Sequence, residues 1–181
     1  MPVEIQKTEP VALVCALMGP DETWLAQGRQ RLAAALGPIR LQSPTYAFDY
    51  TTYYRREMGE GLVKQLVWFE GLVDPALLAS VKQQTMELEK ALGEASEIGI
   101  KRRVNLDPGL VSVESLVLVS TKYSGHRICI AQGLFGETTL LYQKGGYRPL
   151  EWTYPDYRSQ VVQDFLMEVR AFLMQTRRQN A

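Results

Sequence analysis

Histidine and cysteine are scarce in this 181-residue chain, which has one histidine, His126, and two cysteines. Zinc sites draw most of their ligands from these residue types, so no zinc centre is expected. Cys15 and Cys129 each stand alone in an apolar stretch and form no Cys-X-X-Cys pair. The sequence therefore predicts two buried thiols in a reducing compartment.

The chain also lacks any apolar run close to the roughly 20 residues that a membrane helix needs. Residues 1–10 form a polar tail that contains Glu4, Lys7 and Glu9, and this tail predicts no signal peptide. These absences favour a cytoplasmic protein with no membrane partner.

A net charge is missing too, because 20 basic side chains balance 20 acidic ones. Proteins that bind duplex nucleic acid usually carry a basic excess, so no duplex partner is expected. The balance shifts along the chain. Residues 1–100 carry 9 basic and 13 acidic side chains, whereas residues 101–158 carry 8 and 5, which makes this second part mildly basic.

The familiar signatures GxGxxG, GxxxxGK[ST], GxSxG and HExxH are all absent. The dinucleotide-binding, P-loop, α/β-hydrolase and zinc-protease classes therefore have no motif here. What is present is a globular composition, with 46% hydrophobic and 22% charged residues. No repeat or Pro/Gly/Ser-rich linker divides the sequence, so residues 1–181 are expected to form a single domain.

Hydrophobic patterning predicts alternating strands and helices in the first part of the chain. Strands are expected at Val11–Met18, Ile39–Leu41, Leu62–Phe69 and Arg103–Leu106. Asp21 and Asp74 are helix N-caps, and Gly37 and Gly93 end the two helices. The resulting β-α-β-β-α-β order predicts an α+β fold with a ferredoxin-like core, an antiparallel four-stranded sheet with two helices on one face.

The remaining residues are expected to add an antiparallel β extension and a C-terminal amphipathic helix. Extension strands are expected at Arg127–Ala131, Glu137–Tyr142 and Tyr147–Trp152. Lys144-Gly145-Gly146 is a tight hairpin signal, and Val113–Ser120 fits either a short helix or a strand. The last helix, from about Arg158 to Arg177, has an apolar stripe wide enough to predict burial of residues such as Phe165.

The first polar cluster lies in residues 101–109. If the two apolar side chains of its strand face the helices, Arg103, Asn105 and Asp107 point together from the opposite face. A guanidinium, an amide and a carboxylate in a row, with Arg102 beside them, suit an anionic ligand. The alternative is a solvated sheet face followed by a Pro-Gly turn.

The second cluster is the loop of residues 120–127, in which small hydroxyl residues stand beside Lys122 and Arg127. Such a loop can form a phosphate cradle. A histidine side chain can donate a proton to a leaving group, which makes His126 a candidate acid or base. The alternative is a polar connector.

The third cluster is acidic and contains Glu137, Glu151 and Asp156. If these carboxylates converge, they can hold Mg²⁺, which makes Mg²⁺ the candidate cofactor. The alternative is that Asp156 caps the last helix and Glu151 pairs with Arg158 or Arg148.

A fourth segment, Tyr46–Arg56, interleaves aromatic and cationic side chains as base-stacking surfaces do. The alternative to a base-stacking surface is an aromatic strand edge followed by a loop that packs on the domain.

Five runs carry a resemblance to a known family. They are GPIRLQSPTYAFDYTTYY, RRVNLDPG, STKYSGHRI, GETTLLY and PLEWTYPDYR, in this order. In these runs the chain, from about Val11 to Arg170, resembles an uncharacterised prokaryotic family, the domain of unknown function numbered 4416. The resemblance implies a free-standing protein of this size and brings no activity, cofactor or catalytic residue.

The leading hypothesis is a domain that binds a phosphate-bearing or other anionic small molecule, nucleotide-like in character. Phosphoryl or phosphodiester transfer is the reaction that such a site would support. The expected anion-holding residues are Arg102, Arg103, Asn105, Asp107, Lys122, Arg127 and Arg158, with His126, Glu137, Glu151 and Asp156 as acids, bases or metal ligands. At least four of eight side chains should then line one concavity, and Arg103 or Arg127 should be partly buried against Glu137, Glu151 or Asp156. The eight are Arg103, Asn105, Lys122, His126, Arg127, Glu137, Glu151 and Asp156.

Two other functions stay open. One is a non-catalytic protein-interaction domain that meets a partner through a sheet edge or the aromatic segment. The other is an RNA-binding module of ferredoxin-like type, although the expected central strands are mainly aliphatic. The sequence does not indicate an oligomeric state.

Overall fold

The computed structural model describes residues 3–5, 7–96 and 99–179. Its strands are β1 (Ala12–Gly19), β2 (Ile39–Gln42), β3 (Tyr46–Ala47), β4 (Val63–Phe69), β5 (Glu94–Ser96), β6 (Gly99–Lys101), β7 (Asn105–Val111), β8 (Ser115–Ser120), β9 (Ile128–Ala131), β10 (Leu134–Gln143) and β11 (Gly146–Pro149). Its helices are α1 (Glu22–Leu36), α2 (Arg55–Met58), α3 (Leu78–Ala91) and α4 (Gln160–Gln179), with 3₁₀ turns η1 (Pro75–Leu77) and η2 (Pro155–Arg158).

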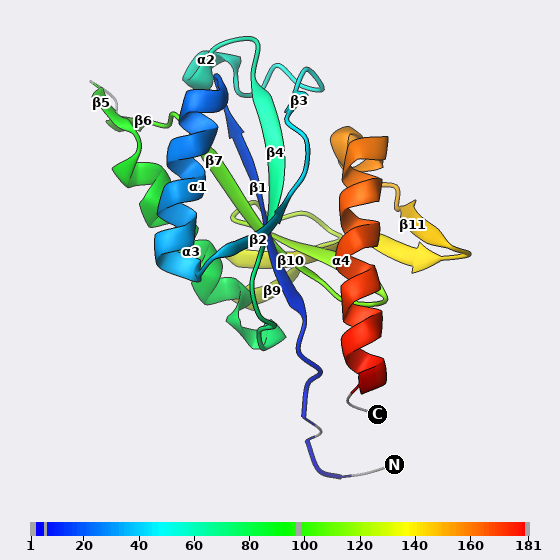
Figure 1. Cartoon of the computed structure of the whole chain (residues 1–181). Helices are drawn as coiled ribbons and strands as arrows, with labels where there is room; N and C mark the ends of the chain where they lie inside the picture. Colours follow the sequence, from blue (N-terminus) through cyan, green and yellow to red (C-terminus); the bar gives the residue numbers. More distant parts are fainter. Residues whose placement is uncertain (1–2, 6, 97–98, 180–181) are drawn as a thin grey trace.

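Nine of the strands form one antiparallel sheet with helices on both faces (Figure 1). The order is β11-β10-β8-β7-β1-β4-β2, with β3 beside β4 and β9 beside β10. Strands β5 and β6 form a separate hairpin. The α+β class and the antiparallel sheet are therefore as expected, but the expected four strands are part of a sheet of nine.

Strand β1 lies inside this sheet and sends alternate side chains to its two faces. Leu13 and Leu17 pack with the apolar side chains of α1 and α3, whereas Val14 and Ala16 pack with those of α4. Strands that are buried on both faces are typically apolar throughout, as β1 is. Strands β1 and β4 are neighbours, with Cys15 opposite Val67, so the strands expected at Val11–Met18 and Leu62–Phe69 lie side by side inside the sheet.

Helix α4 forms a third layer on the face opposite α1 and α3 (Figure 1). Its predicted apolar stripe is confirmed, since Phe165 and Val169 are buried and Phe172 is partly buried. The helix begins at Gln160 rather than near Arg158, because residues 155–158 form the turn η2.

Strand β7 departs from the prediction in a way that shapes the site. It runs Asn105–Val111 instead of Arg103–Leu106, so no turn forms at Pro108-Gly109. Gly109 packs closely on β8, because an added Cβ would lie 2.6 Å from a methyl of Leu118. Strand β8 pairs with β7 only from Gly109 to Val111, and Pro108 has no N–H to offer it. The two strands therefore separate over the first half of β7.

The extension follows most of its sequence signals. The ambiguous segment before residue 120 is the strand β8, and β9 pairs with β10 as expected. Lys144 and Gly145 have φ values of 50° and 83°, as a primed hairpin turn between β10 and β11 requires. Cys15 is buried but Cys129 is exposed, so the prediction of two buried thiols is wrong for Cys129. Among the described residues, no helix has the length and apolar character needed to cross a membrane.

Candidate functional site

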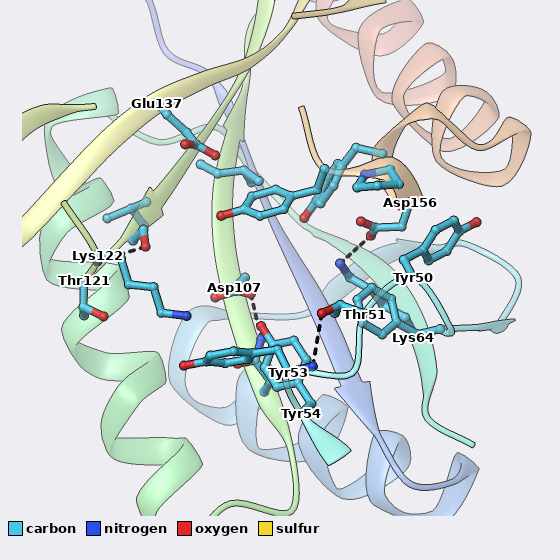
Figure 2. A pocket seen from close by; sticks show the side chains of 18 of the residues that line it. Tyr50, Thr51, Tyr53, Tyr54, Lys64, Asp107, Thr121, Lys122, Glu137 and Asp156 are labelled. Carbon is cyan, nitrogen blue, oxygen red and sulfur yellow. Dashed lines mark hydrogen bonds and ion pairs between the residues drawn. The ribbon is translucent and has the colours of Figure 1, made fainter. Parts of the chain in front are cut away.

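A cavity of about 580 Å³ opens where β7 and β8 separate (Figure 2). Side chains of β4, β7, β8 and β10 line it, together with residues 48–54 and the turn η2. Small-molecule sites in proteins commonly have volumes of about 300–1,000 Å³. The cavity is therefore large enough for a small organic ligand.

Six of the predicted site residues line this cavity, although they span more than 50 positions of sequence. They are Arg102, Asn105, Asp107, Lys122, Glu137 and Asp156. Strand alternation accounts for two of them, because Asn105 and Asp107 of β7 face the α4 side while the intervening Leu106 joins the core beneath α1 and α3. The expectation that at least four candidates share one concavity is confirmed.

Arg127 and His126 stand behind Glu137 rather than at the cavity surface. The buried Glu137 accepts hydrogen bonds at Oε2 from Arg127 Nε, 2.7 Å away, and from His126 Nε2, 2.9 Å away. The His126 ring stacks on Trp152, and its Nδ1 lies 3.1 Å from the Ser124 hydroxyl. The expected burial of Arg127 against a carboxylate is thus confirmed, and both residues hold Glu137 in place.

Arg103, Glu151 and Arg158 lie away from the cavity, contrary to expectation. Arg103 precedes β7, so strand alternation does not apply to it, and it pairs with Glu94. Arg158 donates hydrogen bonds to two carbonyls of the loop before η2.

Glu151 is exposed, and in the described part of the chain it forms no ion pair with either predicted arginine. The predicted convergence of Glu137, Glu151 and Asp156 on Mg²⁺ is therefore wrong. No three His, Cys, Asp or Glu side chains among the described residues lie close enough to hold a metal ion.

Asp156 has a different partner from the one that its sequence position suggests. Instead of capping α4, it accepts a hydrogen bond from Lys64 Nζ at 2.6 Å (Figure 2). The Lys64 and Asp156 side chains are 8% and 2% exposed. Lys64 also lies over the rings of Phe48 and Tyr157, with its Nζ 5.1 and 4.7 Å from their centres. Sequence reasoning missed Lys64, although a lysine inside an interior strand is a signal that a buried partner is needed.

Lys82 was also missed, and it reaches the cavity from α3 through the gap between β7 and β8. Its Nζ lies 2.9 Å from Asp107 Oδ1 and donates a hydrogen bond to the carbonyl of Leu106 at 3.1 Å. Burial by itself would raise the pKa of Asp107, but Lys82 and the other nearby donors outweigh it and hold that pKa below its usual value. Asp107 is therefore ionised in the folded protein at neutral pH.

Arg102 fastens the aromatic segment to the sheet. Its Nε and Nη2 each donate to Glu57 of α2 at 2.7 Å, and its Nη1 donates to Asn105 Oδ1 at 2.9 Å. These hydrogen bonds with Arg102 lower the pKa of Glu57. The segment before α2 contributes Phe48, Tyr50, Tyr53 and Tyr54 to the cavity wall. The segment is thus the short strand β3, a loop and α2, and its aromatic residues other than Tyr46 line the cavity.

Residues 9–172 match the family model described as domain of unknown function (DUF4416). The chain belongs to this family. The resemblance seen in its sequence is thereby confirmed. Comparison with curated proteins gave no match, and comparison with solved structures gave none. The DUF4416 description names no ligand or reaction.

The charges of the cavity are paired with one exception. Lys64, Lys82 and Arg102 each contact a carboxylate. Lys122 lies with its Nζ 3.8 Å from the centre of the Tyr53 ring (Figure 2). No carboxylate of the described residues lies within 4.0 Å of that Nζ. An ammonium without a carboxylate partner is suited to bind a negatively charged group.

Proposed function

We propose that this DUF4416 chain binds an anionic small molecule, with phosphate as the expected anion, in the cavity beside Lys122. The observation that carries the proposal is the unpaired ammonium of Lys122 in a cavity whose other cations are neutralised. The hydroxyl-bearing Ser120 and Thr121 line the same wall and offer further donors to a phosphate oxygen.

The aromatic wall supports a ligand that also has an apolar or planar part. Tyr53 and Tyr54 line the cavity and meet edge to face, with ring centres 5.0 Å apart. Such rings bury large apolar area and stack on flat groups. A compound that joins an anion to an organic body fits these two kinds of wall better than a free inorganic ion.

Binding is better supported than phosphoryl transfer. A general acid must reach the reacting group directly or through one water. His126 does not line the cavity, and both of its ring nitrogens lie within hydrogen-bonding distance of other side chains. The proposal therefore assigns no catalytic step to His126.

We further propose that β7, β1, β4 and β2 form a ferredoxin-like unit within the larger sheet. Along the chain these are the fourth, first, third and second strands of the unit, and all three pairs are antiparallel. Helices α1 and α3 join the first strand to the second and the third to the fourth. The cavity then lies on the face of this unit that α1 and α3 leave free.

Isothermal titration calorimetry tests the binding proposal directly. The purified chain is titrated with nucleotides, sugar phosphates and inorganic phosphate, each with and without Mg²⁺. At least one organic phosphate is expected to bind the wild-type chain. Lys122→Ala should weaken that binding about tenfold or more, because a charge-assisted hydrogen bond is lost.

Arg31→Ala is the matched control, because Arg31 is an exposed cation on α1, across the sheet from the cavity. This variant should bind as the wild type does. Equal affinities of Lys122→Ala and the wild type would contradict the proposal.

A protein-interaction domain remains the second candidate, favoured by the exposed strand β9. Ile128 and Ile130 of this strand are 74% and 43% exposed. Apolar side chains grouped at a sheet edge are typical of surfaces that meet another protein. A chain that binds no organic phosphate would leave this function as the better one.

A further inference from the structure

The cavity contains a buried hydroxyl whose hydrogen-bonding capacity the protein does not use. Tyr157 is 2% exposed, yet in the described part of the chain no hydrogen bond joins its hydroxyl to another group. The hydroxyl oxygen is not one of the completely enclosed atoms that lack a partner. Tyr157 lines the cavity, so the cavity is the space from which a ligand would reach this oxygen. Burial raises the pKa of Tyr157 well above its usual value, so the phenol is a neutral donor.

Two buried carboxylates of the same cavity are only half used. Glu137 receives both of its hydrogen bonds at Oε2, and Asp156 receives its bonds from Lys64 and Tyr46 at Oδ2. Among the described residues, Glu137 Oε1 and Asp156 Oδ1 have no hydrogen-bond partner, and neither is completely enclosed. A buried carboxylate oxygen is stabilised by a donor, so a ligand donor fits each of them.

The surrounding charges select hydroxyl donors over ammonium donors. Each carboxylate already has a cation at close range, Arg127 at 2.7 Å from Glu137 and Lys64 at 2.6 Å from Asp156. A ligand ammonium at either oxygen would also approach that cation and be repelled. A hydroxyl meets no such repulsion, and it can accept a hydrogen bond from Tyr157 while it donates to a carboxylate.

We infer that the cavity takes a phosphorylated polyhydroxyl compound, of which a sugar phosphate is the simplest form. Its anion lies at Lys122, and its hydroxyls meet Tyr157, Glu137 and Asp156. The anion end rests on the proposed function, whereas the hydroxyl end rests on the three unused polar atoms. A nucleotide shares this chemistry through its ribose phosphate. The probes therefore include both sugar phosphates and nucleotides.

The wild-type chain is titrated with ligands that share one phosphate and differ in hydroxyls. The probes are ribose 5-phosphate, glucose 6-phosphate, their 2-deoxy analogues and butyl phosphate, with AMP and 2′-deoxy-AMP as the nucleotide arm. A sugar phosphate or AMP should bind at least about tenfold tighter than butyl phosphate, because a site built for hydroxyls rejects analogues without them. Sugar phosphates that bind as tightly as AMP indicate a sugar ligand, and much tighter AMP indicates a nucleotide.

Tyr157→Phe provides a test on the protein side. The change deletes a hydroxyl without a protein partner, so the melting temperature should stay the same. The affinity for the tightest hydroxylated phosphate should fall about three- to tenfold, with that for butyl phosphate unchanged. Tyr147→Phe is the matched control, because the Tyr147 hydroxyl bonds the Ser112 carbonyl and Tyr147 does not line the cavity.

Three results would overturn the inference. If butyl phosphate binds as tightly as every hydroxylated phosphate and Lys122→Ala weakens them all, the hydroxyl inference fails while the anion proposal stands. If none of the probes binds, both fail. An unchanged affinity of Tyr157→Phe for the tightest ligand would contradict the hydroxyl end of the inference, which relies on Tyr157.

Discussion

A lysine in the interior of a sheet is tolerated only with a well-placed partner, and Lys64 illustrates this at the scale of one residue. Its ammonium and the Asp156 carboxylate are both nearly excluded from water and lie 2.6 Å apart. Two aromatic rings cover the rest of the ammonium. Removing both charges from water is costly, so the pair adds little net stability although each charge depends on the other.

Lys64→Met should therefore destabilise the chain by about 3–5 kcal/mol, since it leaves the Asp156 carboxylate buried without its cation. The double variant Lys64→Met/Asp156→Leu should lose much less, because no buried charge remains. Urea unfolding of the two single variants and the double variant measures the difference. A double variant as unstable as the sum of the singles would show that the pair has no such dependence.

Sequence reasoning found the site's charged residues where they cluster and missed them where they are isolated. Arg102, Asn105 and Asp107 lie in one polar run, and strand alternation placed Asn105 and Asp107 on one face. Lys64 and Lys82 are each the only charged residue in their stretch of sequence, residues 61–69 and 75–86, and their partners are 92 and 25 positions away. Pairing over such distances depends on sheet order and on the gap beside β7, which the local pattern does not contain.

At the scale of elements, long apolar runs were predicted well and short irregular segments were not. Strand β1 and helix α4 follow from eight or more residues of unbroken apolar content or periodicity, and β4 follows from a run of apolar residues bounded by Gly61 and Gly71. Helix α2 spans only Arg55–Met58, and it is held by Arg102 rather than by a stripe of its own. Tertiary contacts decide the structure of so short a segment, so its sequence carries little signal.

Helix α4 should be an integral part of the fold rather than a peripheral attachment. Phe165 is 3% exposed and packs in the cluster between α4 and the sheet. Phe165→Ala should cost about 3–5 kcal/mol, as for other core aromatic residues, because a cavity remains. Guanidinium unfolding measures the loss. Glu168→Ala, an exposed position on the same helix, is the control and should change stability by less than about 0.5 kcal/mol.

At the scale of the whole molecule, one network of charges joins α2, β7 and α3 around the cavity. Arg102 bonds Glu57 of α2 and Asn105 of β7, and it also lies 3.4 Å from Glu89 of α3. Glu89 accepts a hydrogen bond from the backbone N–H of Leu106 at 2.6 Å. The network fastens both the aromatic segment and α3 to the strand that lines the cavity, so its ionisation should affect the stability of the entire fold.

Glu89 should make the chain less stable as the pH rises. Burial raises the pKa of Glu89 above its usual 4.5, so the folded state keeps its proton at a pH where the unfolded state has lost it. Stability from this group is therefore complete below pH 4.5 and is lost as the pH rises through the folded-state pKa.

The variant Glu89→Gln still accepts a hydrogen bond from the backbone N–H of Leu106, but its side chain does not titrate. The stability of this variant relative to wild type should rise above pH 4.5, by at most about 1.4 kcal/mol per pH unit, and then level off. Urea unfolding across that range measures the difference. Glu87→Gln, on the exposed side of the same helix, is the control, and its unfolding free energy should change with pH as that of the wild type does. If the unfolding free energy of Glu89→Gln also follows that of the wild type across this range, burial of Glu89 does not control the pH dependence of stability.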